Sequence, residues 1–238
     1  CIRDRATSFN GDVSKWTFPK AKSMNHMFYK AESFDSAVTG WEFPEATDLS
    51  SLFNGAVSFT GEGVAGWTFP KVEHMYTMFK NAWSFNGDVS MWTFPKVESM
   101  SSMFHDAAIF DGDLTNWKFP EAIDLSYMFA GTTLFTGKGM AGWTFPKVRR
   151  MDNMFRLAEK FNGDVSEWTF PKVMYMEEMF KDAKSFNGDI TKWERPPLEP
   201  MVTGMFEGAT SFNGALPDWL QEALSENPPP HSWVTVDD

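Results

Sequence analysis

Aspartate residues that follow glycine recur along this chain and have the side chains best suited to metal chemistry. Four of them form two pairs with a spacing of 25 residues: Asp88 with Asp113, and Asp164 with Asp189. Carboxylates stacked in neighbouring turns can supply the oxygen ligands that calcium prefers. Lys138 and Ala37 take the corresponding place elsewhere in the chain, which would interrupt a continuous array. Because Asp side chains also hydrogen-bond to nearby backbone in turns, we favour turn capping over calcium binding.

The remaining candidate groups for catalysis or metal binding do not form a recognisable site. The four histidines occupy different positions of the repeat described below: His26, His74, His105 and His231. We therefore do not expect them to converge as metal ligands. Neither a Gly-x-Gly-x-x-Gly motif nor a P-loop follows an expected strand, and no Ser, His and Asp grouping has a familiar context. We expect no enzymatic activity and no cofactor.

Composition and charge exclude several classes of partner. The formal net charge is −11, and Lys and Arg are interspersed among the acids, so there is no basic stripe for a nucleic acid to follow. No run of about 18 apolar residues exists, so we expect no membrane span. The single cysteine, Cys1, supports no disulfide framework.

A repeat of about 25 residues positions all of these side chains. Tryptophans recur at a nearly constant interval: Trp16, Trp41, Trp67, Trp92, Trp117, Trp143, Trp168, Trp193 and Trp219. Phenylalanines keep step with them: Phe9, Phe34, Phe59, Phe85, Phe110, Phe135, Phe161, Phe186 and Phe212. A longer period, which spans three repeats, relates residues 41–67 to residues 117–143. This pattern predicts a stack of coils in which each coil contacts its neighbours.

Residues 161–186 show what one coil is expected to contain. Val165, Trp168 and Phe170 have the spacing of a short parallel strand, which Pro171 would end. Apolar residues then follow at helical spacing: Val173, Met176, Met179, Phe180 and Ala183. We therefore predict an α/β repeat solenoid with leucine-rich-repeat-like coils, each a short parallel strand plus a short helix.

The coils are expected to make one elongated domain. Residues 1–214 would form eight to nine coils with an incomplete N-terminal coil, residues 215–226 a capping helix behind Pro217, and residues 227–238 a tail. An open N-terminal coil would expose a strand edge and apolar surface. We expect further chain or a partner protein there.

One face of the predicted strands is a candidate for protein contact. Thr17, Thr68, Thr93, Thr144 and Thr169 would point outward, but Glu42, Lys118 and Glu194 interrupt the row at every third coil. This mixture excludes a flat, ice-binding threonine lattice and suits a protein partner better. The predicted contact residues are Lys15, Thr17, Met91, Thr93, Asn116, Lys118, Glu167 and Thr169.

Two linked motifs carry a resemblance to a known family. They are Phe-Asn-Gly-Asp-Val-Ser-x-Trp-x-Phe and Val-x-x-Met-x-x-Met-Phe-x-x-Ala, which together recur from Ala6 to Gly214. The chain resembles the BspA-like leucine-rich-repeat surface proteins, in the 25-residue branch typical of mycoplasma-type surface lipoproteins. The resemblance implies a solenoid, adhesion or protein binding, and a cell-surface or extracellular location.

The leading hypothesis is a non-catalytic repeat scaffold that mediates protein–protein interaction. It would act as an accessory subunit of a larger assembly, inside a cell or an organelle, or as a surface adhesin. The alternative is a surface module that binds glycan or calcium through the Gly-Asp turns and an exposed tryptophan such as Trp83.

Overall fold

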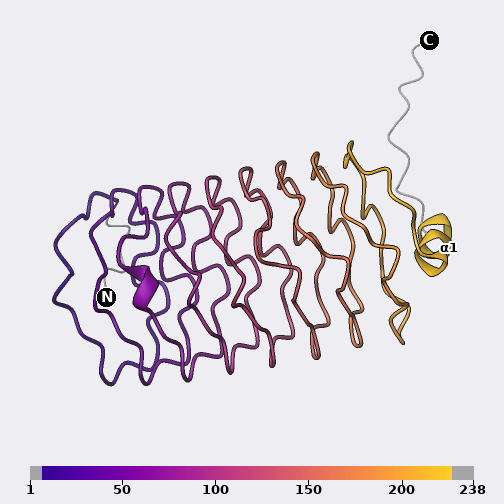
Figure 1. Ribbon diagram of the computed structural model, residues 1–238. Coiled ribbons are helices and arrows are strands. Elements are labelled where there is room, and N and C mark those ends of the chain that lie inside the picture. The colour runs from indigo at the N-terminus through magenta and orange to yellow at the C-terminus, as the bar shows by residue number, and fades with distance from the viewer. Residues whose placement is uncertain (1–6, 227–238) are drawn as a thin grey trace, which may run out of the picture.

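A computed structural model describes residues 7–226 and shows a stack of similar coils along the length of the chain (Figure 1). Single-residue parallel bridges join neighbouring coils, from Ser23 with Asp48 to Tyr175 with Met201. Bridged residues are 25 or 26 positions apart in the sequence. Each coil therefore takes up one sequence repeat.

Regular secondary structure is almost absent from this stack. Within residues 7–226 the helices are the 3₁₀ helix η1, Val64–Gly66, and the α-helix α1, Asp218–Glu226. No strand in the same range extends beyond an isolated bridge. The predicted α/β repeat solenoid, with a strand and a helix in every coil, is therefore wrong. The predicted tail, residues 227–238, lies outside the described residues.

A succession of turns replaces the helix that was expected after Pro171. The N–H groups of Met176 and Phe180 donate to carbonyls of the next coil, at 2.8 and 2.9 Å. The N–H of Met179 instead donates within its own coil, to the Met176 carbonyl at 3.3 Å. An α-helix would direct all of these N–H groups to carbonyls four residues earlier. Alternate N–H groups here point along the stack, so bonds between coils compete successfully with the helix.

The turns depend on left-handed backbone at two positions of each coil. Twelve non-glycine residues among those described have φ between 52° and 61°. In the coil of Met176 they are Glu178 and Asp182, four residues apart. Each such residue costs about 1–2 kcal/mol relative to a right-handed conformation. The hydrogen bonds to the neighbouring coils must offset this cost.

The segment around Trp168, where a strand was expected, is held in place by side chains and not by a backbone ladder. Trp168 and Phe170 are buried and Thr169 is exposed, as in a strand. No backbone hydrogen bond between coils joins the Trp-x-Phe segments of the described chain. The indole Nε1 of Trp168 instead donates to the Met140 carbonyl of the preceding coil at 3.0 Å. Most of the described tryptophans make the equivalent bond, so the indole performs the role of a backbone donor.

Aromatic rings in register form the core of the stack. Seven tryptophan rings, from Trp16 to Trp168, stack with centroids 5.8–6.4 Å apart. Phenylalanine rings form a parallel column from Phe28 to Phe206, at 5.3–5.8 Å. Rings inside the stack are almost fully buried. Burial of these large apolar surfaces between coils is the main favourable term for the fold.

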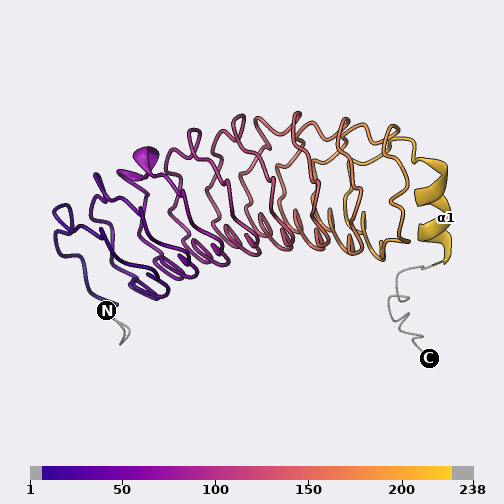
Figure 2. The same ribbon diagram turned by 90° about the horizontal axis from the view of Figure 1, so that it is seen from below.

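The stack is gently arched, and α1 lies across its C-terminal end (Figure 2). Trp219 and Leu220 of α1 are buried against the last coil. The turn segments lie on the concave side of the arch and η1 on the convex side (Figure 2). We call the partly exposed residues of the Val-x-x-Met-x-x-Met-Phe-x-x segments, such as residues 173–182, the turn face. We call the exposed residues of the Trp-x-Phe-Pro segments, with the residue before each Trp, the tryptophan face.

Candidate interaction faces

All of the predicted contact residues are exposed on the tryptophan face. They are Lys15, Thr17, Met91, Thr93, Asn116, Lys118, Glu167 and Thr169. The structure brings the four central ones together on two neighbouring coils. Asn116 Nδ2 donates to the Ser90 carbonyl at 3.0 Å and lies 3.9 Å from Met91 Sδ. Lys15 with Thr17, and Glu167 with Thr169, belong to other coils and form separate pairs.

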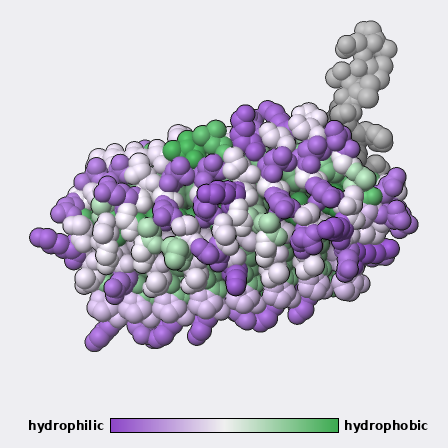
Figure 3. All heavy atoms as spheres, in the orientation of Figure 1, coloured by the Kyte–Doolittle hydropathy of each residue, from purple (hydrophilic) through white to green (hydrophobic). Residues whose placement is uncertain are grey.

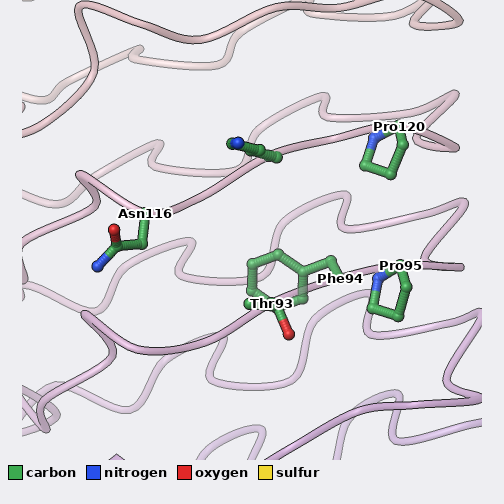
Figure 4. Close-up of a pocket in the computed structure, with 6 residues that line it drawn as sticks. Thr93, Phe94, Pro95, Asn116 and Pro120 are labelled. Carbon is green, nitrogen blue, oxygen red and sulfur yellow. The ribbon is translucent and has the colours of Figure 1, made fainter.

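Shallow grooves separate neighbouring coils on the tryptophan face. One of them, with a volume of about 160 Å³, is lined by Thr93, Phe94, Pro95, Asn116, Lys118 and Pro120 (Figure 4). Equivalent grooves beside Thr17 and Thr169 have volumes of about 220 and 240 Å³. Thr17, Thr93 and Thr169 hold the same repeat position, so these three grooves lie three coils apart. Pockets for drug-sized ligands are about 300–1,000 Å³, so each groove has room for a single side chain of a partner.

The four weak calcium candidates cap turns. Asp88 accepts a hydrogen bond from the Ser90 N–H at 2.9 Å, and Asp113, Asp164 and Asp189 accept equivalent bonds two residues on. Among residues 7–226, no group of three or more His, Cys, Asp or Glu side chains is arranged to hold a metal ion. These carboxylates therefore serve the backbone of their own turns.

Lys138 occupies the position that breaks the aspartate array. Its Nζ lies 2.8 Å from Asp113 Oδ2, and that contact together with the Thr115 bonds lowers the pKa of Asp113 to about 2. The lysine thus forms an ion pair with the aspartate of the preceding coil.

The turn face has a different and richer set of side chains. All four tyrosines of the chain lie on it: Tyr29, Tyr76, Tyr127 and Tyr175. Three histidines join them, at residues 26, 74 and 105, on three different coils. Three of the chain's arginines are there as well: Arg149, Arg150 and Arg156. His231 lies outside the described residues.

Arg150 is held rigidly at the centre of the basic part of this face. Its Nε and Nη2 donate to the two carboxylate oxygens of Asp152 at 3.0 and 3.1 Å. Its guanidinium lies over the Tyr175 ring, 5.3 Å from the centroid. The bonds to Asp152 raise the pKa of Arg150 above its already high value. The guanidinium is thus preorganised, because little side-chain freedom remains to be lost on binding.

Two titratable groups on the turn face have perturbed pKa values because they are partly buried. Burial lowers the pKa of His105, whose Nε2 lies 3.3 Å from Asp106 Oδ2 and whose ring stacks on Tyr127. Burial raises the pKa of Glu177, whose Oε2 has no hydrogen-bond partner among the described residues. Both groups favour their neutral forms more than the same groups in water would.

The sequence predicted contact residues on the tryptophan face and none on the turn face. A regular helix was expected after each Pro, and its polar positions were not among the predicted contact residues. The available signal was variation between coils of this one chain. The two residues after the first Met are Asn25-His26 in one coil, Asp152-Asn153 in another and Glu177-Glu178 in a third, whereas Thr recurs on the tryptophan face.

Most of the chain also matches one known protein family. One family model matches in three overlapping stretches, residues 2–65, 35–141 and 123–227. The chain belongs to the family described as Mycoplasma protein of unknown function, DUF285. Three successive matches agree with the internal repeat, so the prediction of a repeat protein is confirmed. No curated protein is detectably similar to the chain.

Within residues 7–226, no helix combines the length and the apolar character needed to cross a lipid bilayer.

Proposed function

We propose that this DUF285 protein is a non-catalytic repeat scaffold that binds another protein along its turn face. The observation that carries the proposal is the concentration of tyrosine, histidine and arginine on one concave surface. Tyrosine and arginine are enriched where proteins bind each other, because they bury large areas and form directed hydrogen bonds.

Differences between coils favour the turn face over the tryptophan face. A surface that repeats the same residues offers the same contacts at every coil, so it defines no unique binding position. The turn face differs from coil to coil, with acids at Glu73 and Glu98 and arginines at Arg149 and Arg150. Such a pattern suits a partner bound in one register, and repeat proteins commonly use their concave surface in this way.

Two settings are compatible with this role. Resemblance to BspA-like surface proteins supports an adhesin that presents the turn face outside a cell. A stable accessory subunit of a larger assembly would use the same face inside a complex. Both settings require a protein partner and no chemistry on that partner.

The proposal is tested by isolating the protein gently from its source and mapping its contacts with a lysine-reactive cross-linker. We expect cross-links to the partner from Lys30, Lys80 and Lys181 of the turn face. Lys20, Lys96 and Lys172 lie beside the Trp-x-Phe-Pro segments and provide the internal control. Cross-links confined to the control lysines would contradict binding through the turn face. A protein that migrates alone would contradict the scaffold role.

A further inference from the structure

One edge of the stack has exposed apolar side chains on three consecutive coils. They are Trp83, Ile109 and Leu134, which are 57%, 42% and 47% exposed. Figure 3 shows a compact hydrophobic patch on the upper edge of the stack, surrounded by polar residues. Exposed apolar side chains that cluster in this way usually mark an interaction site.

These residues belong to one row that runs along the stack, which we call the side edge. It consists of the two residues that precede the second phenylalanine of each coil, such as Lys184-Ser185. Backbone bonds join successive members: Ser84 N–H to the Val57 carbonyl at 3.2 Å, and Leu134 N–H to the Ala108 carbonyl at 3.2 Å. The order along the edge is therefore set by the coil register.

The side edge has opposite charges at equal distances from its apolar centre. Glu32 lies three coils before the coil of Ile109, and Lys184 lies three coils after it. Trp83 and Leu134 lie one coil on either side of Ile109. If the row is reversed and placed against itself, Glu32 meets Lys184 and the apolar centre meets itself, whereas Val57-Ser58 meets Glu159-Lys160.

We propose that the side edge is the interface of a homodimer in which two copies of the chain lie antiparallel. A two-fold axis through the coil of Ile109 places each Ile109 against its symmetry mate. Trp83 of each copy then packs against Leu134 of the other, and Glu32 of each copy meets Lys184 of the other. A surface that pairs with itself in this way is the kind that two-fold symmetry requires.

The charges select the register of this dimer, and the apolar centre provides the affinity. Lys184 Nζ bonds Glu159 Oε1 at 2.7 Å within its own chain, and both side chains are about half exposed. An exposed ion pair contributes little and is readily exchanged for another. Long-range complementarity between Glu32 and Lys184 would still orient the two copies and disfavour a parallel pairing.

The dimer leaves the turn face open, so it is independent of the proposed protein-binding role. A pair of antiparallel copies would present two turn faces to a larger or multivalent partner. Loss of the dimer and loss of partner binding are separate results that different substitutions produce.

The first test is analytical ultracentrifugation of the full chain over a range of concentrations, together with two variants. We expect a concentration-dependent dimer, and Ile109→Asp should weaken it by at least about tenfold because each substitution acts twice at the axis. Met91→Asp is the matched control, since Met91 is 69% exposed but lies on the tryptophan face. A chain that stays monomeric, or a dimer that survives Ile109→Asp, would overturn the proposal, as would a dimer that only Met91→Asp dissociates.

The second test addresses the antiparallel register. Glu32→Lys alone should weaken the dimer at low ionic strength, and addition of Lys184→Glu in the same chain should restore it. Both residues are exposed, so the variants are expected to fold, and a thermal melt verifies this. Failure of the double variant to recover dimerisation would refute the proposed pairing of Glu32 with Lys184.

Discussion

Trp92 and Trp67 occupy the same position of successive coils but differ in one hydrogen bond. Trp92 Nε1 donates to the Val64 carbonyl at 2.9 Å. Trp67 Nε1 is buried and has no acceptor among the described residues. Both side chains are at most 2% exposed. Trp67 and Trp143 both follow coils with one extra residue, and the Trp143 Nε1 bond to the Leu114 carbonyl is correspondingly long at 3.4 Å.

We therefore predict that Trp92→Phe destabilises the protein more than Trp67→Phe does. Both substitutions remove the same ring atoms from a stacked column, so their packing costs should be similar. Trp92→Phe also removes a hydrogen bond that contributes about 1 kcal/mol, whereas Trp67→Phe removes an unpaired buried donor that costs about 1–3 kcal/mol. The expected difference in the free energy of unfolding is about 2 kcal/mol or more.

Guanidinium unfolding of the two variants and the parent chain measures this difference. Midpoint and slope are both required, because a changed slope would indicate a changed denatured state or loss of cooperativity. In a thermal melt the gap corresponds to about 2–4 °C for each kcal/mol in a chain of this size. Equal losses for the two variants, or a larger loss for Trp67→Phe, would refute the role assigned to the indole bond.

Three further predictions concern backbone strain and pH. Gly139→Ala should destabilise the folded protein by about 2 kcal/mol or more, because Gly139 has φ +89° and a Cβ there would lie 2.3 Å from the Thr115 backbone nitrogen. Gly142→Ala is the control, since a Cβ at Gly142 meets nothing within 4 Å, and the unfolding midpoints of the two variants are compared. Leu157→Asn should raise stability by up to about 1 kcal/mol in the same assay, since Leu157 is 44% exposed with φ 61° and Asn tolerates this conformation better. Burial lowers the pKa of His105 in the folded state, so the free energy of unfolding should fall as the pH drops below 6.5, the ordinary pKa of histidine. His105→Gln should remove that part of the pH dependence of unfolding. An unchanged pH profile would exclude His105 as its cause.

The sequence was most informative where a residue type is compatible with only one environment in the structure. Tryptophans at a nearly constant spacing indicated which residues are equivalent, and the structure places their rings in one column. Alternation of Trp168, Thr169 and Phe170 indicated which side chains are buried. Burial follows from the cost of exposing large apolar groups to water, and that cost is a property of each residue.

The sequence was misleading where two backbone structures share one pattern. Met176, Met179, Phe180 and Ala183 have the spacing of a helical stripe. The same spacing arises in a series of turns, which return a side chain to the interior every three or four residues. Glu178 and Asp182, with positive φ, belong to two such turns. Apolar periodicity alone cannot distinguish them, since it records which side chains face inward and not where each N–H points.

The sequence predicted one candidate interaction face, and the structure shows a second. The eight predicted residues are exposed, but the structure adds a second face with the tyrosines and arginines. Arg150 and Tyr175 belong to neighbouring repeats, and only the register of their two coils brings the guanidinium over the ring. The same register aligns Glu32 and Lys184 on one edge, although most of the chain separates them in the sequence.

The sequence by itself determined the repeat, its length and the identity of the buried side chains, because these depend on hydrophobicity and on periodicity along one chain. The tertiary structure decided the conformation of each coil. An isolated coil has no partner for the N–H groups of Met176 and Phe180, so a helix would be its natural solution. In the stack those N–H groups find carbonyls of the next coil at 2.8 and 2.9 Å, and this external pairing stabilises left-handed turns at every repeat.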